Sequence, residues 1–341
     1  MIEKLKKYFE QYLHIDNIVY SSYDVYVILL KKEKNINTNE DKINVINSNT
    51  CTYYGDSFTI LDIINKYDCT KSNGTLEIKM DTGYLGRINI SNETFKFEIN
   101  KQIQSKNFKY KNDLGVAYYY SLEPAYYKNI AENNDEYTGE YREWYTDGSL
   151  YIESEYLNSK LHGEYLEYYG AVYNNSLNIK CHYDNGEMIG TFLSWYPNGQ
   201  FEVISKYYKM NSDVTWRTTE FFETGKIKRV SMKKNGEYNG WYIKCFPNGN
   251  CNELIEYDRG KVCGHKYVFD EQYNMAFHEN KNIGIYTKCE ICGKNRVYYI
   301  YVNINKKLYS NDQIGSGPFY DEPCNGICNE CKKNTININT H

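Results

Sequence analysis

The chain has 341 residues, with 40 basic and 44 acidic side chains and a net charge of −4. Because charges of both signs are mixed along the chain, composition gives no overall attraction to nucleic acid or to an anionic membrane. The length accommodates two or three domains.

The start of the chain predicts a short amphipathic helix. Its apolar residues, Ile2, Leu5, Phe9 and Leu13, are spaced along one helical face, and lysines lie between them. This charge excludes a signal peptide, and the longest apolar run, 25–30, is far shorter than the roughly 20 residues that span a bilayer. We expect a soluble protein of the cytoplasm or nucleus whose 11 cysteines are reduced thiols or metal ligands.

Residues 1–110 are expected to form a small α+β domain. Alternating apolar residues from Tyr23 to Leu29 predict a strand, and Ser57 followed by an apolar spacing of three and four predicts a second helix. Three further alternating runs predict a three-stranded meander. The helix would carry Ile60, Ile63, Ile64 and Tyr67; the meander would carry Leu76, Ile78 and Met80, then Ile88 and Ile90, then Phe95, Phe97 and Ile99.

Residues 111–278 repeat a pattern about every 25 residues. If Gly139 is position zero, an aromatic pair follows at positions five and six, Asp147-Gly148 at eight and nine, and Tyr156 at seventeen. Further copies start at Gly190 and Gly240. Two copies depart from the pattern: the copy from Gly163 has a three-residue insertion, and Trp216 replaces the glycine in another.

Each repeat carries two turn signals, which leave room for two strands of six to eight residues and so predict a β-hairpin. A lone hairpin is marginal in water, so the hairpins should stack edge to edge in an elongated antiparallel array. Neighbouring repeats would then lie about 10 Å apart, too far for equivalent aromatic rings to touch. We expect the position-seventeen tyrosine to fill the space between them.

The pattern G-x4-[WYF]-[YF]-x-x-G, which recurs from Gly139, Gly190 and Gly240, resembles the MORN repeat in its divergent second form. The resemblance implies an elongated β-meander that serves as a scaffold, as a membrane-contact module or as an attachment to other domains. The abundance of Tyr, Asn, Ile and Lys resembles the codon bias of an AT-rich genome, such as that of the giant DNA viruses of amoebae, which often encode MORN-like proteins. This resemblance would place the chain in host cytoplasm or a virion.

Residues 279–335 read as a zinc-ribbon-like module, followed by a frayed tail at 336–341. Cys289 and Cys292 form one C-x-x-C pair, and Cys328 and Cys331 form a second. Two such pairs supply the four thiolates that structural Zn²⁺ prefers, and a closed four-thiolate site leaves no open position for catalysis. Cys324 is an alternative ligand to Cys328.

No Walker loop, nucleophile elbow, H-E-x-x-H motif or kinase set occurs, so we expect no enzyme activity. The leading hypothesis is an interaction scaffold that presents a tyrosine-rich β surface to a protein partner, with nucleic acid disfavoured and the oligomeric state open. An alternative is peripheral association with anionic lipid through the array. A third is an unrecognised enzyme in residues 1–110. The lipid alternative rests on a basic cluster of Lys226, Lys228, Arg229, Lys233 and Lys234.

Overall fold

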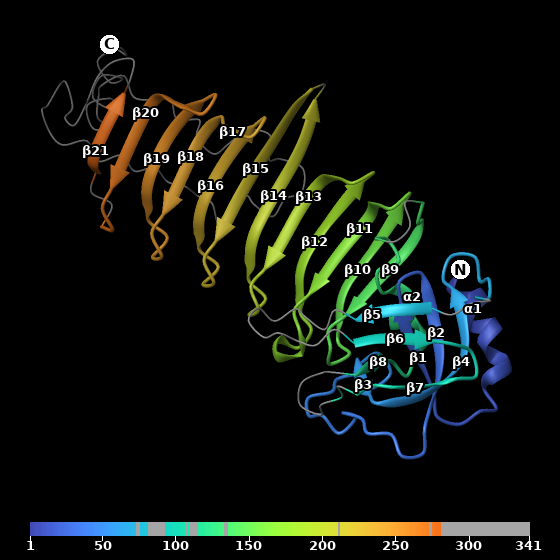
Figure 1. Cartoon of the computed structure of the whole chain (residues 1–341). Helices are drawn as coiled ribbons and strands as arrows, with labels where there is room; N and C mark the ends of the chain where they lie inside the picture. Colours follow the sequence, from blue (N-terminus) through green and yellow to red (C-terminus); the bar gives the residue numbers. More distant parts are fainter. Residues whose placement is uncertain are drawn as a thin grey trace, which may run out of the picture. The chain divides into compact units, whose positions relative to one another are not determined.

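The structure is a computed structural model that describes residues 1–72, 76–80, 93–106, 108, 115–132, 136–210, 212–272 and 275–280 (Figure 1). The described chain is mainly β, built from antiparallel strands, as the sequence predicts. It divides into two compact units, Met1–Gly199 and Gln200–His341. No described helix is long and apolar enough to cross a membrane.

The first unit opens with the predicted helix, α1 (Ile2–Phe9), followed by the 3-10 turn η1 (Glu10–Tyr12). Leu5 and Phe9 are buried, which explains why this face of the helix is apolar. Leu13 lies beyond the helix and is 75% exposed. The predicted apolar stripe is therefore confirmed for its first turns and ends before Leu13.

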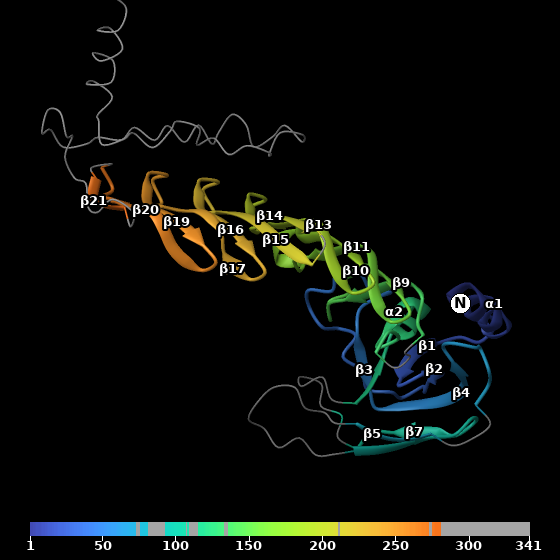
Figure 2. The same ribbon diagram turned by 90° about the horizontal axis from the view of Figure 1, so that it is seen from above.

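A four-stranded antiparallel sheet forms the body of the N-terminal region, in the order β1-β2-β4-β7. Two further pairs, β3-β8 and β5-β6, accompany it. Figure 2 shows the short helix α2 (Leu122–Tyr127) on one side of this region, beside β1. The strands are β1 (Ile18–Tyr23), β2 (Tyr26–Lys32), β3 (Tyr53–Gly55), β4 (Ser57–Asn65), β5 (Leu76–Met80), β6 (Glu93–Phe97), β7 (Gln102–Gln104) and β8 (Val116–Tyr118).

The predicted single strand from Tyr23 to Leu29 is wrong, because the chain reverses inside it. Tyr23 ends β1 and pairs with Tyr26, the first residue of β2, so Asp24 and Val25 form a two-residue hairpin turn. Asp24 adopts a φ of 48°, a left-handed conformation that aspartate tolerates better than most residues. The alternation of apolar residues continued across the turn and concealed it.

The predicted helix from Ser57 is also wrong, because this segment is strand β4. Leu30 pairs with Ile60 and Leu29 with Asp62, so Leu61 is an extra residue that forms a β-bulge. The bulge lets Ile60 and Ile63 join the same core cluster although they are three residues apart. A bulged strand thus reproduced the spacing of a helical face.

Apolar side chains cover this sheet on both faces. Ile28 and Leu30 of β2 belong to one core cluster, whereas Val27 and Leu29 belong to a second cluster with α1 and α2. A strand that is buried on both faces reads as a continuous apolar run and loses the alternation that marks a half-buried strand. The sequence of β4 was ambiguous for this reason as well.

The predicted three-stranded meander is confirmed for its outer strands and corrected in their order. β5 pairs directly with β6, and the register places Leu76 opposite Phe97 and Ile78 opposite Phe95. In a meander the middle strand would separate them. The predicted middle strand, at Ile88 and Ile90, lies outside the described residues.

The repeat region consists of the predicted hairpins. The first unit holds five strands in sequence order, and the second unit holds eight, of which the short β17 pairs with β16. The first five are β9 (Gly139–Trp144), β10 (Leu150–Leu157), β11 (Lys160–Tyr168), β12 (Leu177–Asp184) and β13 (Glu187–Trp195); η2 (Ala171–Tyr173) lies in the three-residue insertion. The others are β14 (Phe201–Met210), β15 (Asp213–Phe221), β16 (Ile227–Lys234), β17 (Glu237–Tyr238), β18 (Gly240–Cys245), β19 (Cys251–Asp258), β20 (Lys261–Phe269) and β21 (Met275–Asn280).

The repeat glycine marks a β-bulge. Gly163 and Gly190 lie inside their strands with φ values of 81° and 69°, and each lies where the pairing with the preceding strand shifts register. Where Trp216 replaces this glycine, β14 and β15 pair without a shift from Val203 to Met210. Tryptophan avoids positive φ, so the strand that carries Trp216 in place of the glycine has no bulge at this position.

Hydroxyl groups link successive repeats. The Tyr145 hydroxyl, at position six, donates a hydrogen bond of 2.9 Å to the carbonyl oxygen of Tyr168 at position five of the next repeat. Tyr169 donates an equivalent bond of 2.8 Å to the Trp195 carbonyl. The long phenol side chain thus bridges a gap that the rings alone do not span.

The N-terminal region holds the first repeat at its hairpin turn. The Thr146 carbonyl accepts a 2.9 Å hydrogen bond from Lys42 Nζ, and the Asp147 carbonyl accepts one of the same length from the Ile46 amide. The Thr50 hydroxyl donates a 2.6 Å bond to the Gly148 carbonyl. Loop 42–51 therefore satisfies three consecutive carbonyl groups of this turn.

Aromatic packing on α2 completes the attachment of the first repeat. The Tyr127 ring lies 6.4 Å from the Tyr141 ring and 6.1 Å from the Trp144 ring of β9. Both β9 residues pack against the cluster that contains Leu5 and Phe9. The first strand of the array thus shares its core with the N-terminal region.

Gly148→Ala is expected to destabilise the protein much more than Gly199→Ala. Both glycines occupy the same turn position with positive φ (87° and 82°), so each substitution incurs a conformational cost of about 1–2 kcal/mol. A Cβ at residue 148 would also lie 2.1 Å from the Asn47 carbonyl oxygen, whereas residue 199 has no atom within 4 Å. Overpacking adds about 1–3 kcal/mol. Chemical denaturation of both variants measures the difference, and equal losses would contradict the attachment through loop 42–51.

Candidate functional site

The five predicted zinc ligands, Cys289, Cys292, Cys328, Cys331 and Cys324, lie outside the described residues. Within the part of the chain that the structure describes, no group of three or more histidine, cysteine or acidic side chains could hold a metal ion. The zinc site therefore stays a prediction.

The described cysteines are free thiols, and two of them form a cross-strand pair in the second unit. Cys245 and Cys251 are buried, and burial raises the pKa of Cys245 to about 11 and that of Cys251 to about 12. Both thiols are therefore protonated near neutral pH and are poor nucleophiles. Cys245, which replaces a repeat aromatic, acts as a small apolar core residue.

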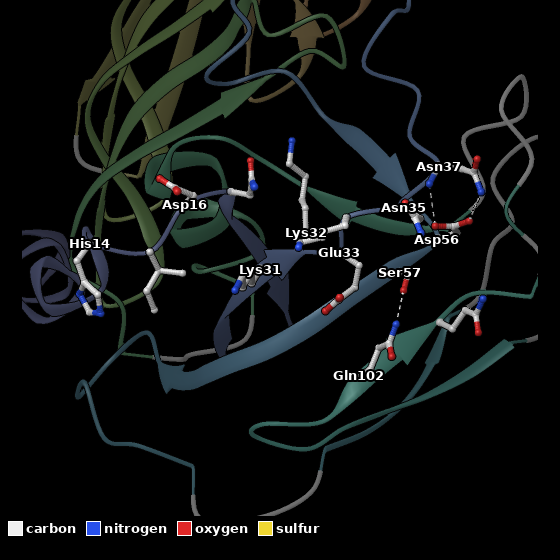
Figure 3. A pocket seen from close by; sticks show the side chains of 14 residues that line it. His14, Asp16, Lys31, Lys32, Glu33, Asn35, Asn37, Asp56, Ser57 and Gln102 are labelled. Carbon is white, nitrogen blue, oxygen red and sulfur yellow. Dashed lines mark hydrogen bonds between the residues drawn. The ribbon is translucent and has the colours of Figure 1, made fainter.

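A cavity of about 840 Å³ opens in the N-terminal region beside β2, β4 and β7 (Figure 3). Two of its three carboxylates accept hydrogen bonds: Asn37 Nδ2 donates a 2.6 Å bond to Asp56, and Thr59 donates to Glu33. Figure 3 shows His14 at the opposite end of the cavity from Asp56. The lining can hydrogen-bond a small polar molecule, but these residues do not form an acid–base pair.

Asp62 is a fully buried aspartate that sequence reasoning missed. Its carboxylate accepts hydrogen bonds from Tyr8 (2.7 Å) and Tyr12 (2.5 Å) and lies 3.2 Å from Lys71 Nζ. Burial and the bond to Asp62 raise the pKa of both phenols. Because the carboxylate is fully paired, its role is to attach the first helical segment to β4.

Lys66 is a fully buried lysine that sequence reasoning also missed. Its Nζ donates hydrogen bonds of 2.7 Å to Ser22 Oγ, 3.1 Å to the Asp24 carbonyl and 2.7 Å to the Lys128 carbonyl. Burial is the main cause that lowers its pKa to about 7, and the charge of Lys128 acts in the same direction. The only signal in the sequence was a charged residue at each end of an apolar run.

The repeat strands of the first unit carry a row of half-buried tyrosines, and we call Tyr141, Tyr156, Tyr165 and Tyr183 the tyrosine face. The position-seventeen ring of Tyr156 lies 5.5 Å from Tyr141, and that of Tyr183 lies 5.9 Å from Tyr165. Tyr141 and Tyr165 are at position two. The predicted filler tyrosine therefore packs on a position-two ring, a contact that the sequence analysis did not foresee.

Small side chains separate the rings of the tyrosine face. Ser154 lies between Tyr141 and Tyr165 in the strand register, and Cys181 follows Tyr165. Both small residues are buried beneath the aromatic side chains. The alternation of large and small residues leaves the phenol groups partly exposed, which suits contact with another protein.

Two glutamates accompany these tyrosines. The Tyr141 hydroxyl donates a 3.3 Å bond to Glu143, and the Tyr165 hydroxyl donates a 3.2 Å bond to Glu167. Burial raises the pKa of Glu143 and of the Tyr141 and Tyr165 phenols, because loss of water disfavours their charged forms. The face therefore combines aromatic rings with negative charge.

Two of the five residues of the basic cluster form ion pairs within the chain, and two others have uncharged partners there. Arg229 pairs with Glu220, Lys234 Nζ lies 2.7 Å from Asp213, and Lys226 Nζ donates a 2.9 Å bond to the Asn248 carbonyl. Lys233 Nζ lies 5.0 Å from the centre of the Tyr238 ring. Partners within the chain reduce the positive electrostatic potential that the cluster would present to an anionic membrane.

Comparison with known proteins adds no assignment. Neither a protein-family model nor a curated protein matches the sequence.

Stability is expected to rise with pH between 7 and 8.5 because of Lys66. Its folded pKa is near 7 against a usual 10.5, so the unfolded chain binds more protons in this window. The free energy of unfolding then increases by up to roughly 1 kcal/mol per pH unit. The buried thiols act in the opposite direction above about pH 8.5, where unfolded cysteines ionise.

Denaturation of the wild type and of Lys66→Met at several pH values isolates this effect. The variant removes the titrating group and should lack the slope, although its unpaired acceptors make it less stable at every pH. Identical slopes in the two proteins would contradict a depressed lysine pKa.

Proposed function

We propose that this chain is a MORN-like, non-enzymatic interaction scaffold that offers the tyrosine face to a protein partner. The observation that carries the proposal is the row of paired, half-buried rings at positions two and seventeen. Rigid aromatic side chains supply contact area at low entropic cost and keep a polar hydroxyl for hydrogen bonding.

The attachment of the array supports the same proposal. Loop 42–51 and α2 order the first hairpin before any partner binds. A preformed surface loses less conformational entropy on binding, so more of its contact energy appears as affinity. The membrane alternative finds less support, because the basic cluster has partners within the chain.

Selection from a displayed library of random peptides tests the scaffold function. The wild type should enrich binding peptides, and Tyr165→Ser should lose about tenfold or more in affinity for them, as aromatic contact residues commonly do. Tyr208→Ser is the matched control, because Tyr208 is an exposed tyrosine of β14 outside the tyrosine face. Circular dichroism confirms that each variant is folded. Failure to enrich any peptide, or equal loss in the control, would refute the proposal.

We also propose that the C-terminal cysteines bind one structural Zn²⁺. Four thiolates in two C-x-x-C pairs form the soft donor set that suits this ion. In the reducing cytoplasm such a site would stabilise a small module whose own core is thin.

Metal analysis of the purified chain should find one zinc ion, and Cys289→Ser should remove it. Comparison of Cys324→Ser with Cys328→Ser identifies which of these two cysteines is the fourth ligand, since only the true ligand is required. Cys69→Ser is the control, because Cys69 lies in the N-terminal region. A wild type without zinc would disprove the site.

A further inference from the structure

One row of cross-strand neighbours runs beside the tyrosine face in the first unit. Glu143 pairs with Ile152, Ile152 pairs with Glu167, and Glu167 pairs with Ile179. Directly opposed residues of antiparallel strands project on the same face of a sheet. Two glutamates therefore flank Ile152, and they lie about 10 Å apart because two strand spacings separate them.

The second unit carries an equivalent row that includes basic side chains. Glu220 pairs with Arg229, and Arg229 pairs with Lys244. The Arg229 guanidinium donates a 2.9 Å hydrogen bond from Nε to Glu220 and a second from Nη2. Tyr242 lies close enough to Arg229 to help raise the pKa of the guanidinium, after the larger effect of Glu220.

The two rows occupy the same repeat positions. Glu143, Glu167 and Glu220 are at position four, and Ile152 and Arg229 are at position thirteen. Position thirteen is therefore a guanidinium in the copy that starts at Trp216, whereas it is Ile152 in the copy from Gly139 and Val203 in the copy from Gly190. The internal comparison shows which cation fits between a position-four glutamate and a neighbouring tyrosine.

Glu143 and Glu167 have no basic partner among the described residues, and the nearest positive influence on Glu143 comes from Lys128, which lowers its pKa only slightly against burial. Glu167 accepts hydrogen bonds from Tyr165 and from Asn178. On the opposite face of the same strands, Glu164 pairs with Lys180 at 2.6 Å and Glu153 pairs with Arg142 at 3.2 Å. Glu143 and Glu167 differ from these two glutamates because they have no such ion pair.

Tyr151 completes this group. It directly precedes Ile152 in β10, where the pairing with β9 shifts register, and its ring lies 4.7 Å from the Tyr145 ring. Burial raises the pKa of its phenol, and the charges of Glu167 and Glu143 raise it further. We call Glu143, Tyr151, Ile152 and Glu167 the acidic notch. Carboxylates beside an aromatic ring suit a planar guanidinium, which accepts bidentate pairing and stacks on the ring, better than they suit an ammonium group.

We propose that the acidic notch binds an arginine side chain of a basic, extended segment in the partner protein, in the place that Arg229 fills within the second unit. This proposal rests on the scaffold function and names the chemistry of its partner. The negative charge of the notch also excludes a polyanion from this part of the face.

The test uses an acetylated, amidated pentapeptide with arginine at its second and fourth positions and serine elsewhere, and the corresponding lysine peptide. Fluorescence anisotropy with the full chain at low salt should show tighter binding of the arginine peptide. The double variant Glu143→Gln, Glu167→Gln should bind it at least about tenfold more weakly, because two charge-assisted contacts are lost. Glu164→Gln, on the opposite face, should change the affinity less than twofold.

Substitution of Ile152 gives a second readout. Ile152→Arg should abolish peptide binding and raise the melting temperature, because the new guanidinium would occupy the notch as Arg229 occupies its own site. Ile152→Leu keeps an apolar residue there and should bind like the wild type. Equal binding of the two peptides, full binding by the double glutamine variant, or unchanged binding by Ile152→Arg would overturn the proposal.

The outcome separates this inference from the scaffold function. Library peptides that depend on Tyr165 but show no preference for arginine would sustain the scaffold and refute the acidic notch. Absence of both library and arginine-peptide binding would refute both.

Discussion

The hydrogen bonds between loop 42–51 and the turn of the first hairpin are the constraint on which the first unit depends. An array of hairpins has no closed core of its own, and the turn of its first hairpin would otherwise lack these contacts. Carbonyl groups of Thr146, Asp147 and Gly148 find donors in the N-terminal region. The close approach that permits these bonds requires a glycine at residue 148. The N-terminal region is in this sense the terminal cap of the repeats.

The buried polar groups of the cap serve the same purpose. Asp62 joins the first helical segment to β4, and Lys66 joins the β1–β2 turn to the end of α2. Each is fully hydrogen-bonded, so its desolvation is offset by contacts that only one arrangement of the segments provides. Since α2 also packs on Tyr141 and Trp144, the polar network indirectly positions the first strand of the tyrosine face.

Repetition within the chain gives a comparison that separates structural from functional side chains. Positions that must build the hairpin, such as the turn glycines and the position-seventeen tyrosine, recur in both units. Position thirteen varies, because it is Ile152, Val203, Arg229 and Glu253 in the copies that start at Gly139, Gly190, Trp216 and Gly240. Ile152 and Arg229 each pair with a position-four glutamate of the preceding strand. The backbone pairing is the same at both places, so the difference changes the charge of the surface without changing the fold. This is the property expected of a position that faces a partner.

The sequence by itself determined the hairpin repeat, because Asn-Gly and Asp-Gly turns and aromatic spacing are local signals that need no distant contact. It also determined the face of α1, whose periodicity reflects burial on one side. Only the tertiary structure decided that Ser57–Asn65 is a strand, because a bulge at Leu61 and burial on both faces produced the spacing of a helix. The hydrogen-bond partners of Lys66 and the packing of Tyr156 on Tyr141 could likewise not be predicted from the sequence. Such contacts join residues through the register of strands and the docking of a loop, and a one-dimensional pattern records neither.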